Sequence, residues 1–214
     1  MVHRGPAWGH DDGPVETAAP SWRDALRGRT RDAHEALDRA LTGPSGRLSG
    51  TGDYVRVVST LHALHAWSEH RLRRWAAASS LAAGLPDDLV LPDRASLYAG
   101  DLLALGAEVA DPDPGRDRGR RSVEVDDAEG LALLYLLGGS SAGARVLLRG
   151  LPDDVPRAAR RGLTDASGPE SSRLWQAVLR LLATPAREPL ATRAADEADA
   201  LFGWLRERAE ERAA

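Results

Sequence analysis

The sequence predicts an all-α protein that folds as a single helical domain. Apolar residues recur at spacings of three and four, which gives each helix one buried face. β-branched residues are sparse and alternating apolar runs are short, so strand signals are weak. With 214 residues, 43% of them hydrophobic, the chain is long enough to bury a sizeable core. We therefore expect one multi-helix bundle.

The expected helices follow from caps, breaks and periodicity. Ser21 is a suitable N-cap for a first helix, which Gly43-Pro44-Ser45-Gly46 ends after about residue 41. A second, long helix is expected over residues 53–79, where Leu, Val and Trp form a wide apolar face. The remaining segments are expected at residues 95–109, 126–149, 153–162 (a short piece), 169–183 and 189–213.

Two segments lack this periodicity. Residues 1–20 are rich in Gly, Pro and charge, and we predict a disordered tail there. Residues 111–121 are charged and broken by proline, which predicts a loop. The helical domain is accordingly expected to span residues 21–214.

Composition restricts the functions to be considered. No apolar run reaches the roughly 18 residues that a membrane span needs, and the N-terminus lacks the apolar region of a secretory signal. The chain has no cysteine, so thiolate chemistry is excluded. A net charge of −4 argues against general nucleic-acid binding. We expect a cytoplasmic protein with neither a membrane nor a nucleic acid as partner.

The first candidate site residue is His34. At about 3.6 residues per turn, Arg27, Thr30, Arg31 and Asp38 fall on or beside its helical face. A neutral imidazole can ligate iron through one nitrogen when an acceptor holds the other, and Asp38 or Thr30 could help to hold it. The two guanidinium groups would suit the propionates of a heme. The alternative is an amphipathic helix with solvated arginines.

The second candidate is the glycine-interrupted helix Leu134-Tyr135-Leu136-Leu137-Gly138-Gly139-Ser140-Ser141-Ala142-Gly143-Ala144-Arg145. Each glycine costs roughly 1 kcal/mol relative to alanine inside a helix, so a close approach is a plausible reason for it. Without Cβ atoms, a flat macrocycle can lie against the backbone. The alternatives are tight helix–helix contact and a helix end at Gly138.

Other chemistries lack their motifs. A di-iron site needs Glu-x-x-His pairs on two helices, and none stands in a usable place. No P-loop, dinucleotide fingerprint, His-Glu-x-x-His or Gly-x-Ser-x-Gly pattern is present. Three further histidines, His62, His65 and His70, lie on the long second helix. We expect them to be structural or exposed at the surface, not ligands.

Taken together, the chain resembles the bacterial, biliverdin-producing heme oxygenase family. Residues 26–38 resemble its proximal helix, with the pattern Leu-Arg-x-x-Thr-x-x-x-His-x-x-Leu-Asp/Glu, and residues 133–147 resemble its distal helix. Residues 54–69, 97–106 and 195–205 show weaker similarity, so that the match spans about residues 21–208.

The resemblance implies a heme oxygenase-like bundle that holds heme between a proximal helix and a glycine-kinked distal helix. Heme would be both cofactor and substrate, cleaved with molecular oxygen to biliverdin, carbon monoxide and ferrous iron. Electrons would come from an external, ferredoxin-type or other reductase, and the product could supply a bilin-binding photoreceptor.

The resemblance also implies residue roles. His34 would ligate the iron, and Gly139, Ser140 and Gly143 would form the catalytic distal side, with Ser141 helping Ser140 to order water. The heme-binding set would be Arg27, Thr30, Arg31, His34, Tyr135, Gly139, Gly143 and Arg173.

Two positions depart from the family pattern. Gly138 stands where the family usually has Glu, and Ala144 replaces the second glycine of a pair. We expect the Ala144 methyl group to press on the distal face, and the missing carboxylate to alter helix anchoring or a water network. Two alternatives therefore stay open: a non-catalytic heme carrier or sensor, and a helical protein-interaction module.

Overall fold

The computed structural model describes residues 21–110 and 124–212, and within them the chain is all-helical, as predicted. These ranges contain seven α-helices and two short 3-10 helices, Ala82–Gly84 and Arg157–Ala159. The α-helices are α1 (Trp22–Thr42), α2 (Thr51–Ala78), α3 (Ala95–Ala104), α5 (Asp127–Arg149), α6 (Arg161–Ala166), α7 (Pro169–Leu182) and α8 (Leu190–Glu211). The predicted tail and loop, residues 1–20 and 111–121, lie outside the described residues.

The two helices that carry the candidate site begin at side-chain caps. The Ser21 hydroxyl accepts a hydrogen bond from the Asp24 N–H at 3.2 Å, and the Asp126 carboxylate accepts one from the Glu129 N–H at 3.0 Å. α1 ends where Gly43 turns into positive φ, at +67°. The boundaries predicted for α1 and α5 are therefore confirmed to within one residue.

The third helix is shorter than predicted. It was expected to reach residue 109, but it ends at Ala104. Gly106 adopts a φ of +69°, and the N–H of Ala107 donates to the carbonyl of Leu102 at 2.9 Å, which closes the helix end. The Gly106 signal was present in the sequence, so it should have shortened the predicted helix.

The short helical piece expected at residues 153–162 lies further along the chain. It consists of a 3-10 turn and then α6, which runs to Ala166. The buried carboxylate of Asp101 on α3 accepts hydrogen bonds from the N–H groups of Arg161 and Gly162, at 3.1 and 2.8 Å. This cap from a distant helix fixes the start of α6, and local sequence could not indicate it.

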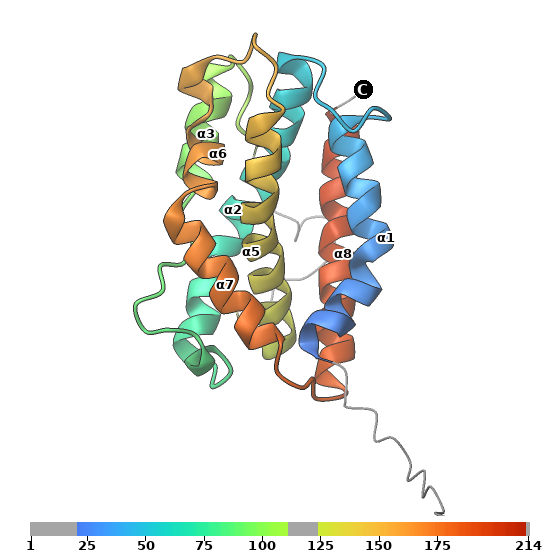
Figure 1. The fold of residues 1–214 in the computed structure, drawn as a ribbon, viewed down its shortest axis with the longest axis vertical. Helices are drawn as coiled ribbons and strands as arrows, with labels where there is room; N and C mark the ends of the chain where they lie inside the picture. The colour runs from blue at the N-terminus through green and yellow to red at the C-terminus, as the bar shows by residue number, and fades with distance from the viewer. Residues whose placement is uncertain (1–20, 111–123, 213–214) are drawn as a thin grey trace, which may run out of the picture.

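The bundle is arranged around α5 (Figure 1). α1 packs along α8, α8 packs on α5, and α2, α6 and α7 also contact α5. α7 crosses the lower half of α5 obliquely, α6 lies against its upper half, and α3 packs on α2 and α6. The main hydrophobic core joins α1, α2, α5, α7 and α8, and a second cluster lies around Tyr54, Tyr98 and Leu163.

By length and hydropathy, α5 is the one described helix that would suffice to cross a membrane. Half of its most apolar window is buried inside the bundle. The buried core helix of a soluble protein meets the same criteria of length and hydropathy. This is weak evidence for a span, and the cytoplasmic location stays a prediction.

Candidate functional site

His34 lies on α1 with a half-exposed side chain, 52% accessible. Its Nδ1 is 3.2 Å from a carboxylate oxygen of Asp38, one turn later, and this hydrogen bond raises the pKa of His34. Of the two candidate orienting groups, Asp38 makes the contact. Thr30 is buried, and its hydroxyl donates to the Leu26 carbonyl at 2.8 Å. Because Nδ1 is engaged, Nε2 is the nitrogen available to a metal.

The glycines of α5 fall into two groups that face different ways. A Cβ built on Gly139 or Gly143 has no neighbour within 4 Å, so both positions face open space. Tyr135, Gly139 and Gly143 are spaced by four residues and share one helical face, which we call the open face of α5. A Cβ on Gly138 would lie 2.7 Å from the Trp175 ring on α7. Tight helix–helix contact thus explains Gly138 but not the other two.

Phe202 on α8 lies between the two halves of the candidate site. Its ring packs edge-on against the His34 imidazole, with centroids 5.1 Å apart, and also against Tyr135 at 6.5 Å. Phe202 of α8 thereby links the candidate ligand on α1 to Tyr135, the first residue of the open face. In the sequence, Phe202 falls within the weakly similar segment 195–205, and it was given no place in the site.

One alternative and one expectation about α5 are wrong. α5 runs without interruption from Asp127 to Arg149, so Gly138 is not a helix end. Ala144 is 1% exposed and belongs to the second hydrophobic cluster, so its methyl group packs inside the bundle instead of pressing on the open face. Ser141 is equally buried, and its hydroxyl lies 3.4 Å from the Arg94 guanidinium. Only Ser140 of the serine pair remains partly exposed.

The three candidate arginines have different surroundings. Arg27 and Arg31 are exposed on α1, and the Nε of Arg31 lies 3.3 Å from its neighbour Asp32. Arg173 on α7 is engaged elsewhere, since its guanidinium pairs with Asp88 at 2.5 Å and with Glu170 at 3.4 Å. Arg27 and Arg31 thus share α1 with His34. Arg173 is instead paired with Asp88 and Glu170.

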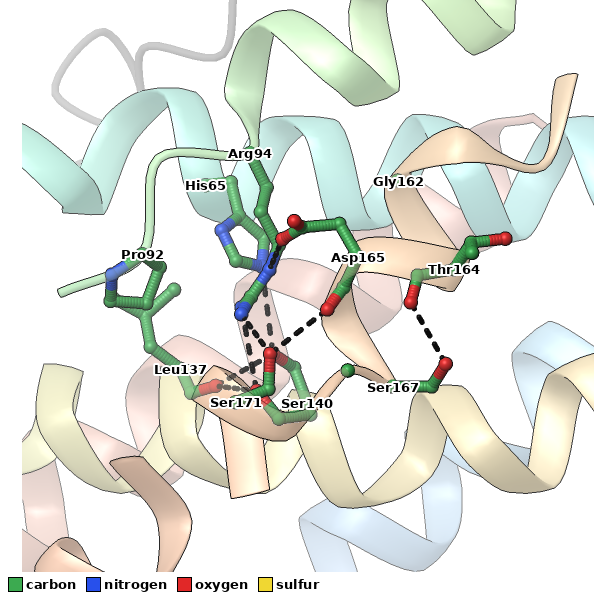
Figure 2. Close-up of polar contacts among 12 residues, drawn as sticks. His65, Pro92, Arg94, Leu137, Ser140, Gly162, Thr164, Asp165, Ser167 and Ser171 are labelled. Carbon is green, nitrogen blue, oxygen red and sulfur yellow. Dashed lines mark hydrogen bonds and ion pairs between the residues drawn. The ribbon is translucent and has the colours of Figure 1, made fainter. Parts of the chain in front are cut away.

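Sequence reasoning missed a buried polar cluster on the other side of α5, which we call the His65 cluster (Figure 2). Nδ1 of His65 lies 2.7 Å from a carboxylate oxygen of Glu69, which also accepts the Arg94 N–H at 2.6 Å. Arg94 in turn pairs with Asp165 at 2.8 Å. The cluster consists of His65, Glu69, Arg94, Ser140, Ser141, Asp165 and Ser171. The signal for it was a histidine followed by a glutamate one turn later on an otherwise apolar helix face.

Burial dominates the protonation of this cluster. His65 is inaccessible to solvent, which lowers its pKa by more than the Glu69 carboxylate raises it. Burial alone would raise the pKa of Glu69, but hydrogen bonds from His65 and from two backbone N–H groups lower it overall. The pair therefore consists of a neutral imidazole and an ionised carboxylate at neutral pH.

Ser140 connects this cluster to the open face of α5. Its Oγ lies 3.5 Å from Nε2 of His65, so that Ser140, His65 and Glu69 follow one another as in a hydrolase triad. Two features argue against a nucleophile. The Ser140 hydroxyl lies 2.8 Å from the Leu137 carbonyl and donates to it, and the surrounding N–H groups of α5 are used in helical hydrogen bonds and cannot form an oxyanion hole.

Among the residues that the structure describes, no three or more His, Asp or Glu side chains are grouped so as to hold a bare metal ion. No protein-family model matches the chain, and no curated protein matches it. The site is therefore interpreted from its own geometry.

Proposed function

We propose that this protein is a heme oxygenase that binds heme between α1 and α5 and cleaves it to biliverdin, carbon monoxide and ferrous iron. The observation that carries the proposal is the placement of His34. Asp38 engages its Nδ1, its ring rests on Phe202, and Phe202 also contacts Tyr135 at the start of the open face. One aromatic side chain thus connects a candidate axial ligand on α1 to the face of α5 that carries Gly139 and Gly143.

The residues present fit a heme. A single histidine whose second nitrogen is held by a carboxylate is an established kind of axial iron ligand. Gly139 and Gly143 leave space that any other side chain would fill, as the backbone contact of a flat macrocycle requires. Arg27 and Arg31 expose guanidinium groups on the helix that carries His34, suited to paired propionates.

When bound, heme supplies the iron centre that activates molecular oxygen, and it is also the substrate. The chain's own contribution is positioning. His34 would ligate through Nε2, while Asp38 fixes its tautomer. Gly139 and Gly143 would let the ring plane approach the helix, and the two arginines would set its rotation and thus the carbon at which the ring opens. Electrons would come from an external reductant of the ferredoxin type.

A heme carrier or sensor would use the same residues, and the two departures from the family pattern are the reason to consider it. In the structure, Gly138 packs against Trp175 and Ala144 lies in the core, so neither faces the open side of α5. This arrangement favours the enzyme over the carrier, because the residues that line the open face retain the family pattern.

The test has two stages. Purified protein is first titrated with hemin, and we expect one equivalent to bind with a histidine-ligated spectrum. The complex is then given reduced ferredoxin, or ascorbate as a substitute donor, under oxygen. We expect the Soret band to give way to a bilin spectrum, with carbon monoxide captured by ferrous myoglobin.

Gly143→Leu supplies the matched variant, since a side chain there must occupy the volume proposed for the macrocycle. We expect it to lose hemin binding or turnover while retaining its helical circular dichroism. Gly28→Leu is the control, because Gly28 is also a helical glycine with open space around its Cβ position. Heme that survives repeated reduction under oxygen would make the protein a carrier. If hemin does not bind stoichiometrically, the remaining interpretation is that the protein is a helical protein-interaction module.

A further inference from the structure

The His65 cluster has a feature that the proposed function does not use, namely a shortage of hydrogen-bonding protons at Ser140. The Ser140 hydroxyl has one proton and two acceptors within reach. These are the Leu137 carbonyl at 2.8 Å and Nε2 of His65 at 3.5 Å. Figure 2 shows Ser140 between them, with the His65 ring pointing toward it.

The proton on His65 is placed by Glu69. An ionised carboxylate can only accept, so the 2.7 Å contact requires the imidazole to carry its proton on Nδ1. Neutral His65 therefore presents the lone pair of Nε2 to Ser140. Because His65 is fully buried, Ser140 is the partner that the structure offers to this lone pair, and an unsatisfied buried acceptor is costly.

Protonation of His65 reverses the direction of this contact. The imidazolium carries N–H groups on both nitrogens, so that Nε2 donates to Ser140 Oγ instead of accepting from it. His65 then no longer competes for the Ser140 hydroxyl proton. It can return to the Leu137 carbonyl or donate to a group on the open face of α5, because Ser140 follows Gly139 directly and is only half-buried.

We propose that His65 is a positioning residue that sets the direction of the Ser140 hydroxyl, and through it the hydrogen bond offered to an anionic or polar ligand on the open face of α5. While His65 is neutral, the Leu137 carbonyl and the lone pair of His65 Nε2 both attract the single Ser140 proton, so that Ser140 presents an acceptor to the ligand. Protonated His65 lets Ser140 donate. The part of this proposal that concerns the ligand rests on the proposed heme site, whereas the coupling between His65 and Ser140 does not.

The groups around His65 come from every element packed on it. Glu69 and His62 lie on α2, and the guanidinium of Arg94 and the ring of Tyr98, at 5.1 Å, approach from α3 and the segment before it. Asp165 approaches from α6. Glu69 favours the imidazolium and Arg94 opposes it, while Asp165 is half-exposed and its charge is screened. Burial therefore decides, and the neutral form is the resting one.

The coupling is tested first on the full chain without hemin. Nitrogen-15 NMR resolves the tautomer of each histidine, and His65→Gln assigns the His65 signals. We expect His65 to carry its proton on Nδ1 and to titrate below the usual range. Ser140→Ala removes the acceptor for the imidazolium, and we expect it to lower the His65 midpoint further, by about one unit, equivalent to one charge-assisted hydrogen bond.

The matched control is His70→Gln, which alters an exposed histidine on the same helix and should leave the His65 midpoint unchanged. A neutral His65 protonated on Nε2, or an unchanged midpoint in Ser140→Ala, would overturn the proposal. We expect Ser140→Ala and His70→Gln to keep the helical backbone intact, and circular dichroism checks this.

The effect on the open face is read with fluoride, an anion that takes a hydrogen bond when it binds ferric heme. We expect its affinity in the hemin complex to rise as pH falls through the His65 midpoint, after correction for free fluoride. In Ser140→Ala this step should be lost, with roughly tenfold weaker binding at the acidic end. If fluoride affinity rises equally with falling pH in Ser140→Ala and in wild type, the proposed hydrogen bond from Ser140 to the ligand is overturned. If hemin does not bind through His34, the proposed function fails, while the NMR titration still decides the coupling.

Discussion

His34 and His65 share one local pattern and have opposite environments. Each is followed one turn later by a carboxylate that contacts its Nδ1, Asp38 at 3.2 Å and Glu69 at 2.7 Å. The His34 side chain is 52% exposed, whereas that of His65 is inaccessible. The pKa of His34 is raised and that of His65 is lowered.

The difference shows that the motif alone does not decide what a histidine does. In the exposed pair, the hydrogen bond to Asp38 outweighs a modest desolvation. In the buried pair, desolvation outweighs an even shorter contact. His34 is left with an accessible nitrogen suited to a ligand, while His65 is enclosed and can act only through the side chains that it touches.

The largest expected effect separates the two carboxylates. Glu69→Ala removes the partner of His65 and of two backbone N–H groups in the core, so we expect a loss of about 3 kcal/mol in the free energy of unfolding. Asp38→Ala removes an exposed contact and should cost less than about 0.5 kcal/mol. Urea denaturation measures both. Equal losses would mean that burial does not distinguish the two pairs.

The glycines of α5 extend the comparison to the two sides of one helix. Gly138→Ala places a methyl group against the rigid ring of Trp175, and we expect a loss of about 1 to 3 kcal/mol. Gly139→Ala meets no neighbour and should gain up to about 1 kcal/mol from helix propensity. Thermal denaturation of the ligand-free proteins gives the sign. Destabilisation by both changes would place Gly139 in a packed interface.

The opposite pKa directions predict opposite effects of pH on stability. The pKa of His65 in the folded state lies below its ordinary value of 6.5, so its contribution is lost as pH falls from about 6.5 toward the folded value. The pKa of His34 is raised, so its small contribution is present below about 6.5 and lost as pH rises through the folded value.

The measurement is the free energy of unfolding of wild type and His65→Gln between about pH 5 and 8. We expect the wild type to lose stability toward acid more steeply than the variant. A variant that retains the full slope would assign the acid sensitivity to other groups.

The smallest expected effect on stability belongs to the arginines of α1. Arg27→Ala combined with Arg31→Ala should leave the melting temperature of the ligand-free protein nearly unchanged, because both side chains are exposed. Hemin binding should weaken by roughly 1.5 to 3 kcal/mol per lost propionate bond, and the bilin isomers should become mixed. Unaltered affinity and isomer pattern would make these arginines a solvated face.

Local signals in the sequence predicted the all-helical character and most of the helices. Ser21 predicted the start of α1, and apolar residues spaced by three and four predicted the long helices. The start of α6 was out of reach, because it depends on the carboxylate of Asp101 about sixty residues earlier. The close packing at Gly138 could not be predicted for the same reason, because its partner Trp175 comes from another helix.

The candidate site was predicted only in part. His34 and the glycines could be selected from spacing, since their side chains share helical faces. The role of Phe202 depends on α8 lying between α1 and α5, which is a tertiary fact. The His65 cluster was missed because a lone histidine among Leu and Trp is usually structural, and because its partners Arg94 and Ser140 come from distant parts of the chain.

The central claim is that His34, and not His65, is the heme ligand. The most direct test compares the absorption spectra of the ferric hemin complexes of wild type, His34→Ala and His65→Gln, with imidazole added back to each. We expect His34→Ala alone to lose the histidine-ligated Soret band and to recover it with imidazole, while His65→Gln keeps the band. An unchanged Soret band in His34→Ala would contradict the account.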